Sequence, residues 1–252
     1  MKIISKSFFA GAALTMFSAL MATPAVAMTV QPVVIDLQTA GRGMTQIITV
    51  ENTFAAPLPV ELRIEALALD ENGVKLTGKD PGDLLVFPPQ ALIAPGQTQT
   101  FRVQHVGEPD IKASKHYYVT VAQLPVKLPE GQSAIQILYN FQVLVSIAPA
   151  GAKPSLSIQS AAVGRDAAGK PVAVLVLRNA STAHGYLSSG RLRIIQKDAA
   201  GKEVFRKTMS GPEVQQTIGF GLVGAGQTRR VTVPVQLPLD GGSVEASFTP
   251  EG

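Results

Sequence analysis

Residues able to carry acid–base, nucleophilic or metal chemistry are sparse in this chain. Its 252 residues include three histidines and no cysteine. His105, His116 and His184 lack the short spacing that brings imidazoles together on one metal ion. Without cysteine there is no disulfide, thiolate ligand or thiol nucleophile, and no serine lies in a Gly-x-Ser-x-Gly elbow. We therefore expect no enzyme activity, no metal and no other cofactor.

A glycine-rich segment, Gly219–Gly224, fits the Gly-x-Gly-x-x-Gly pattern of dinucleotide-binding proteins. In those proteins the pattern joins a strand to a helix that begins directly after it. Here the residues that follow, Thr228–Val233, alternate like a strand. We interpret the segment as a loop between strands.

The first 27 residues have the pattern of a secretory signal peptide. Lys2 and Lys6 precede an apolar run over residues 8–21, and Ala25–Ala27 supplies an Ala-x-Ala cleavage site. The alternative, a membrane anchor, needs about 20 apolar residues, and this run is shorter. We expect cleavage after Ala27, a periplasmic protein and no membrane span after cleavage.

The net charge gives no reason to expect a nucleic-acid partner. The formal charge is +4 over the whole chain and +2 once Lys2 and Lys6 leave with the signal peptide. Arginine and lysine are not clustered with aromatic residues, as they are on nucleic-acid-binding surfaces.

The segment 134–149 has the most informative pattern. Every odd position from Ile135 to Ile147 is apolar, and this period of two indicates a strand with one apolar face. The even positions are mixed in character. The strand is longer than the usual five or six residues, so part of it is available to pair with another chain.

The rest of the chain alternates in the same way over short runs that Gly, Pro, Asn and Asp separate, including an expected strand near 215–219. No amphipathic helix is expected beyond the signal segment. The pattern predicts an all-β protein of two immunoglobulin-like β-sandwich domains. We place them at 28–149 and 150–252, with Pro149–Pro154 as the hinge.

Blocks of the first half resemble the PapD-like periplasmic pilus (fimbrial) assembly chaperones. They follow the family's order: Pro32–Leu37, Ile48–Asn52, Asp83–Pro89, Ala94–Val103, Tyr117–Pro125 and the 134–149 strand. The Pro-x-x-x-Asp-Leu and Leu-Leu-Val-x-Pro-Pro patterns look closer to the archaic pilus chaperones than to the PapD type itself. The second half is similar only in its strand content and in Leu177–Asn179.

The resemblance implies two sandwiches in a boomerang that bind pilus subunits and deliver them to an outer-membrane usher. Such a subunit lacks its last strand, and the chaperone lends one by β-augmentation. Ile135, Ile137 and Tyr139 match the family's donor positions, and Phe141 is a possible fourth. The alternative is that these side chains fill the protein's own core.

One family feature is missing from this chain. The family holds the subunit's terminal carboxylate with an arginine on the first strand and a lysine on the last. In this chain the matching positions are Val34 and about Leu144. A buried carboxylate needs a cation or paired donors. Arg102 is the leading replacement, with Lys115 and His116 behind it, while the alternative for Arg102 is a structural or solvated strand residue.

Two other function classes stay open. One is a secreted immunoglobulin-like structural or adhesive pilus module, which would keep the long strand within its own fold. The other is an exported carbohydrate- or small-ligand-binding protein that uses the cleft between the domains.

Overall fold

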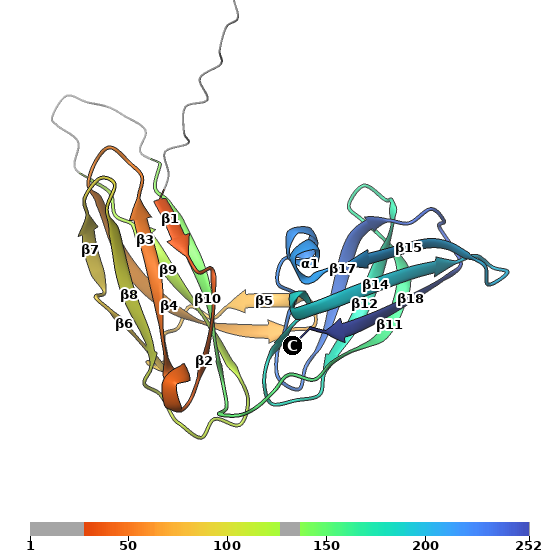
Figure 1. Cartoon of the computed structure of the whole chain (residues 1–252), viewed down its shortest axis with the longest axis horizontal. Coiled ribbons are helices and arrows are strands. Elements are labelled where there is room, and N and C mark those ends of the chain that lie inside the picture. Colours follow the sequence, from red (N-terminus) through yellow and green to blue (C-terminus); the bar gives the residue numbers. More distant parts are fainter. Residues whose placement is uncertain (1–27, 127–136, 252) are drawn as a thin grey trace, which may run out of the picture.

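The computed structural model describes residues 28–126 and 137–251. Ile135 and the proposed signal peptide lie outside these residues. Two β-rich lobes meet at an angle, and the predicted all-β, two-sandwich boomerang is confirmed (Figure 1). Within the described residues, no helix is both long and apolar enough to span a membrane.

The first lobe is a sandwich of two sheets. One sheet has the order β1-β3-β8-β6, with bounds Met28–Gln31, Thr45–Asn52, Thr98–His105 and Leu84–Phe87. The other has the order β2-β10-β9-β4-β5, with bounds Val34–Gln38, Asn140–Ala148, Lys115–Gln123, Leu58–Asp70 and Gly73–Leu76; β7, Gln90–Ile93, pairs with β4. A 3-10 turn, η1 (Gly41–Met44), follows β2.

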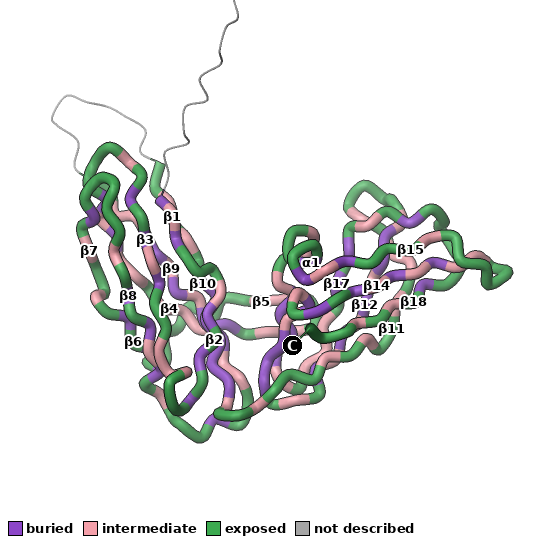
Figure 2. The backbone as a smooth tube through the Cα atoms, in the orientation of Figure 1, coloured by how far each residue is buried: buried purple, intermediate pink, exposed green. Residues whose placement is uncertain are grey.

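The period of two explains which side chains are buried in this sandwich. On β8, Phe101 and Val103 are fully buried between the sheets, while Arg102 between them faces solvent. Two strands break the antiparallel pattern, because β2 pairs with β10 in parallel. Figure 2 shows the buried positions along the inner faces of both lobes.

The second lobe is built in the same way around its own core. One sheet has the order β11-β12-β17, with bounds Leu156–Arg165, Pro171–Asn179 and Thr228–Gln236. The opposite sheet has the order β15-β14-β18, with bounds Glu203–Met209, Gly190–Lys197 and Ser243–Pro250. Short elements complete it: β13 (Gly185–Tyr186), η2 (Leu187–Ser189), α1 (Gly211–Ile218) and β16 (Leu222–Val223).

Helix α1 corrects two sequence expectations, because residues 215–219 were expected to form a strand and no helix was expected after the signal segment. The helix begins at a capping box in which Ser210 and Glu213 bond each other's backbone N–H groups, with a proline in the first turn. Val214 of the helix is fully buried against the core of the second lobe. Eight residues give barely two turns, so no 3.6-residue period was visible in the sequence.

The segment Gly219–Gly224 leaves α1 and contains β16, so it is a connection without the strand–turn–helix unit of a dinucleotide site. Gly219 and Gly221 have positive φ angles of 75° and 65°, which glycine adopts without steric cost. The segment is a connection, as expected, but it follows a helix rather than a strand and contains the two-residue strand β16.

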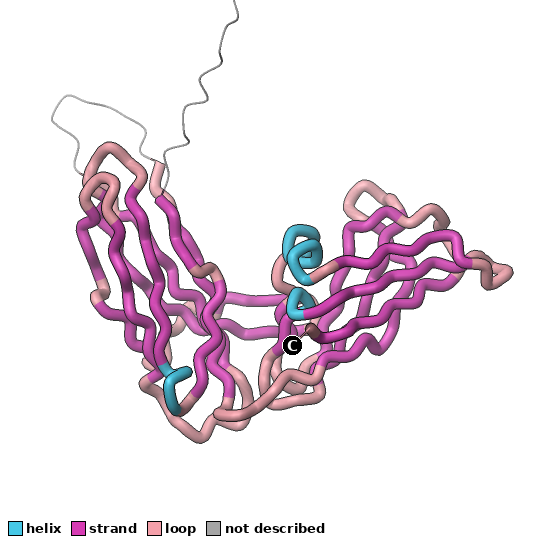
Figure 3. Tube along the Cα trace, in the orientation of Figure 1, coloured by secondary structure: helices cyan, strands magenta, loops and turns pink. Residues whose placement is uncertain are grey.

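The two lobes touch over a mixed interface. The tip of the β4–β5 hairpin reaches the second lobe, where the Arg230 N–H donates to the Glu71 carbonyl at 2.7 Å. Leu67 and Leu144 of the first lobe form an apolar cluster with Leu222 of the second. In Figure 3, α1 lies on the side of the second lobe that faces the first. These contacts join the two lobes where they meet.

Candidate functional site

Strand β10 has one open edge over its first half. It pairs with β9 from Asn140 to Ile147, but with β2 only from Leu144 to Ala148. Within the described ranges, no strand therefore pairs with residues 140–143 on the β2 side. The Leu144 N–H donates to the Val33 carbonyl at 3.0 Å, and this bond closes the edge.

The direction of the main-chain groups follows from that bond. Along an antiparallel strand, successive residues direct their N–H and C=O groups to opposite edges. The Gln123 N–H donates to the Tyr139 carbonyl at 2.9 Å, so odd residues of β10 bond to β9. The peptide groups of Asn140 and Gln142 share the direction of Leu144 and face the open edge.

The apolar row becomes more exposed toward its start, and β10 itself begins only at Asn140, so residues 137–139, which were expected within the strand, precede it. Val143, Val145 and Ile147 are fully buried in the core of the first lobe. Phe141 and Tyr139 are half-buried against that core, and the side chain of Ile137 is 69% exposed. An apolar row that leaves its own core beside an unpaired edge is suited to contact a partner strand.

Tyr139 is held in place where the row leaves the core. Its N–H donates to the Gln123 Oε1 atom at 3.2 Å, and its ring lies 5.8 Å from that of Phe54. Tyr139 and Phe141 thus pack against the same core, as the alternation predicted, whereas Ile137 precedes β10 and is mostly exposed. Both the donor role and the core role of these side chains remain predictions.

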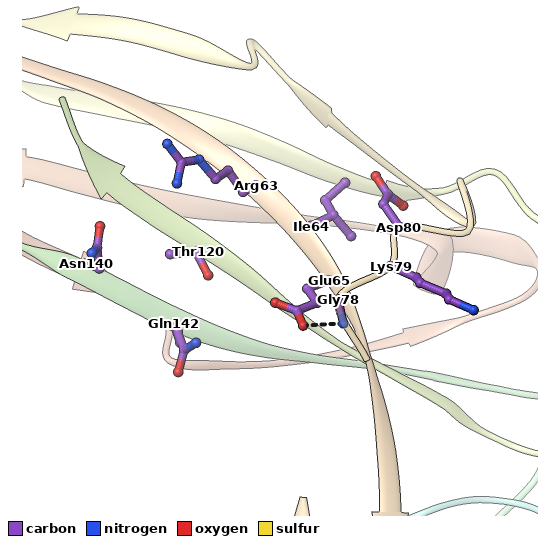
Figure 4. Close-up of a pocket in the computed structure, with 9 residues that line it drawn as sticks. All are labelled: Arg63, Ile64, Glu65, Gly78, Lys79, Asp80, Thr120, Asn140 and Gln142. Carbon is purple, nitrogen blue, oxygen red and sulfur yellow. Dashed lines mark hydrogen bonds between the residues drawn. The ribbon is translucent and has the colours of Figure 1, made fainter. Parts of the chain in front are cut away.

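The other face of β10 borders a polar pocket of about 660 Å³ (Figure 4). Gln142, Thr120 and Arg63 stand in one row across β10, β9 and β4. The Gly78 N–H donates to the Glu65 carboxylate at 2.6 Å on the floor of the same pocket. Its remaining lining residues are Ile64, Lys79, Asp80 and Asn140. The face of β10 opposite the apolar row is therefore polar beside the open edge.

The two positions that lack the family's cations are direct neighbours. Val34 and Leu144 are paired in the parallel ladder of β2 and β10, at the closed end of the open edge. Both contribute to the apolar cluster between the lobes. The structure therefore places an apolar contact between the lobes, and no charged pair, at these two positions.

Arg102, the leading replacement cation, lies on a different sheet from β10. Its side chain is exposed on β8, between Ile47 and Phe87 on the neighbouring strands. Both neighbours are also exposed, at 53% and 62%. This position offers no contact with the open edge, so its anchoring role stays a prediction without structural support.

Lys115 is already paired with an acid. Its Nζ atom lies 3.0 Å from the Asp83 carboxylate, which also accepts a hydrogen bond from the Tyr117 hydroxyl. Burial raises the pKa of Asp83, but the bonds from Tyr117 and Lys115 outweigh it and hold that pKa below its usual value. The charge of Lys115 is thus paired with Asp83 within the first lobe.

His116 is buried and neutral rather than cationic. Its Nδ1 atom lies 2.9 Å from the Ser146 hydroxyl, and its ring packs edge-on at 5.3 Å from the ring of His184. Burial, followed by the proximity of His184, lowers the pKa of His116 to about 3. A neutral imidazole supplies no positive charge for a carboxylate.

A polar network between the lobes was not anticipated from the sequence. Nε2 of His184 lies 2.8 Å from the Asp36 carboxylate, and the Tyr186 hydroxyl donates to the same oxygen at 2.7 Å. The other ring nitrogen of His184 lies 2.9 Å from the Ser114 hydroxyl. These partners are far apart in the chain, so no local spacing could have revealed the network.

In this network the Asp36 carboxyl group is ionised and the Tyr186 hydroxyl keeps its proton. Burial raises the pKa of Asp36, but the hydrogen bonds from His184 and Tyr186 hold it below its usual value. Burial, followed by the Asp36 charge, raises the pKa of Tyr186, so its hydroxyl stays a donor. The described part of the chain contains no group of three or more histidine or acidic side chains that could hold a metal ion.

Arg229 brings one further cation to the interface between the lobes. It donates to the Leu222 carbonyl, and burial lowers the pKa of its guanidinium group. Among the described residues, no acidic side chain lies within salt-bridge distance of it. No local pattern in the chain distinguishes this arginine from its neighbour Arg230.

The fold and the site define a two-sandwich, immunoglobulin-like protein with an open strand edge at its elbow. Solved structures share this fold at low sequence identity. The class 5 fimbriae chaperone CfaA has a TM-score of 0.54 and 12% identity, over 90% of this chain and 93% of that one. The YadV chaperone has a TM-score of 0.53 and 14% identity, over 88% and 91%.

A third similar chain comes from the CsuC–CsuE chaperone–tip adhesion subunit pre-assembly complex of the archaic chaperone–usher Csu pili of Acinetobacter baumannii. Its TM-score is 0.50 at 12% identity, over 82% of this chain and 90% of that one. No curated protein sequence matches the chain.

Residues 27–153, just over half of the chain, match the family model of the pili and flagellar-assembly chaperones, PapD N-terminal domain. The chain belongs to this family. It is a family of chaperones and not of enzymes.

Proposed function

We propose that this protein is a periplasmic chaperone that lends a strand over about residues 134–147, which includes the open first half of β10, to fimbrial or pilus subunits and passes them to an outer-membrane usher. The open edge over residues 140–143 is the observation that carries the proposal. A subunit that lacks one strand would bond to the peptide groups of Asn140 and Gln142. The names of two similar structures describe chaperones in complex with a tip adhesin or tip subunit.

The apolar row supplies the affinity in this proposal. Full burial of an exposed aliphatic or aromatic side chain contributes about 1.5 to 3 kcal/mol. Ile137 has the most area left to bury, while Tyr139 and Phe141 already lie against the core and contribute less. Ile135, the first of the three matched donor positions, lies outside the described residues.

Export is a separate part of the proposal, and it rests on the sequence of the first 27 residues. N-terminal sequencing of the exported protein should begin at Met28. A membrane-retained product that begins at Met1 would contradict both the signal peptide and the periplasmic location.

Co-expression with single fimbrial subunits tests the main function. We expect a one-to-one complex that protects the subunit from degradation in the periplasm. The matched comparison is Leu92→Ser, which alters a side chain 71% exposed on β7, away from β10. That variant should retain the complex; no complex with any fimbrial subunit would refute the chaperone proposal.

The rival function is a structural or adhesive pilus module. The contacts of Tyr139 and Phe141 with the protein's own core favour it. Such a module has no need of an unpaired edge on β10, and it should polymerise or remain alone rather than form a one-to-one complex.

A further inference from the structure

The open edge of β10 ends at a groove between the lobes. Since the Leu144 N–H is already bonded to the Val33 carbonyl, a strand added beside residues 140–143 cannot continue past Val33. At this point the chain crosses from β1 in one sheet to β2 in the other. A groove of about 680 Å³ lies here, lined by Gln31, Pro32, Val33, Val34, Thr49, Gln215 and Phe220.

Both lobes build this groove. Gln215 belongs to α1 and Phe220 follows it, so the second lobe forms one wall. The Phe220 ring packs edge-on against Tyr186 at 6.2 Å, and Tyr186 is bonded to Asp36 of the first lobe. The wall is therefore held in place by the network between the lobes.

The groove is uncharged. None of its seven lining residues is acidic or basic, and the side chain of Val33 is 46% exposed. The neutral groups of Gln31, Thr49 and Gln215 can hydrogen-bond to a peptide backbone but cannot neutralise an ion. A charged side chain that entered would lose hydration without gaining an opposite charge.

We propose that this groove receives the end of the partner strand that pairs with β10 and selects an uncharged, apolar side chain there. The inference rests on the proposed strand donation and adds the chemistry of the partner at one end of it. Recognition at this end depends on apolar contact with Val33, Val34 and Phe220, in place of a bond between a cation and a terminal carboxylate.

Three substitutions of Val33 test the proposal on the complex with a co-expressed fimbrial subunit. We expect Val33→Lys and Val33→Glu to weaken subunit binding by about tenfold or more each, because either charge is desolvated. Val33→Leu should keep the affinity within about threefold. If Val33→Lys strengthens binding while Val33→Glu weakens it, the groove receives a carboxylate and the proposal is wrong.

Unchanged affinity in all three variants would also overturn it, because the groove would then be unoccupied. Thermal unfolding of each free variant checks that β2 is intact. Should Val33 variants unfold, Phe220→Lys and Phe220→Leu repeat the comparison from the second lobe. Leu92→Lys is the matched surface control, since it adds the same charge at an exposed apolar position.

The outcome is separable from a failure of strand donation. Gln142→Pro removes a peptide N–H from the open edge without touching the groove. If Gln142→Pro abolishes the complex and Val33→Lys does not weaken it, only the groove proposal fails. If neither change affects a complex that forms, the partner binds elsewhere and both proposals fail.

Discussion

Nδ1 of His116 on β9 lies 2.9 Å from the hydroxyl of Ser146 on β10, in a buried position beneath the second lobe. The opposite ring nitrogen of His116 is buried without a hydrogen-bond partner among the described residues. The ring is therefore stable in its neutral form only. Its protonation would place a charge beside His184 at the interface between the lobes.

This pair predicts a loss of stability in mild acid. The pKa of His116 is about 3 in the folded protein and near 6.5 in the unfolded chain, so the unfolded state binds the proton first. The free energy of unfolding should fall as the pH drops below about 6.5, by up to about 1.4 kcal/mol per pH unit, until about pH 3. Urea unfolding at a series of pH values measures this slope.

His116→Gln should flatten the dependence, because the amide keeps a polar group beside Ser146 but does not titrate. A residual slope is expected from His105, whose pKa burial also lowers. Asp36 adds to the loss only below its unfolded pKa of about 3.8, since its folded pKa is lower still. A slope identical to that of the unmodified protein would exclude His116 as the cause.

Proline substitutions should distinguish the two edges of β10. Gln142→Pro removes an N–H that faces the open edge, so the free protein should fold while subunit binding falls. Phe141→Pro removes an N–H that bonds to β9 and leaves its partner unsatisfied, so it should destabilise the free sandwich by about 1 to 3 kcal/mol. Thermal unfolding and recovery of the complex, measured for both variants, provide the comparison. Equal effects on folding would show that the assigned directions are wrong.

Replacing Ile135, Ile137 and Tyr139 together with Ser or Thr should abolish the subunit complex and leave the free protein folded. Ile137 is mostly exposed, and only Tyr139 of the described pair contacts the core. The core control is Ile147→Ala, where loss of a fully buried side chain should cost about 2 to 5 kcal/mol. A melting temperature as low as that of the control would refute donation and favour the structural-module function.

Arg102→Ala should leave both stability and subunit affinity unchanged, because its side chain is exposed on the sheet that lacks β10. Surface changes of this kind usually alter the free energy of unfolding by less than about 0.5 kcal/mol. Titration of subunit against the variant measures the affinity. A clear loss of affinity with normal folding would instead support Arg102 as the carboxylate anchor.

The sequence alone determined the elements that depend on local pattern. Alternation of apolar residues identifies a strand and its apolar face, which is why Ile137, Tyr139 and Phe141 were expected on one face. Helix α1 was missed although its capping box at Ser210 and Glu213 is also local. The helix is too short to show a period, so the cap was the only available signal.

The tertiary structure decided which neighbour each strand has. Alternation is the same whether a strand edge is paired or open, so only the register of β2 against β10 shows that pairing stops at Leu144. The same register places Val34 beside Leu144. The two positions expected to lack the family's cations therefore form one apolar contact. Asp36 and His184 meet only because two separately folded cores dock against each other, and an interaction between docked domains leaves no period or spacing in the chain.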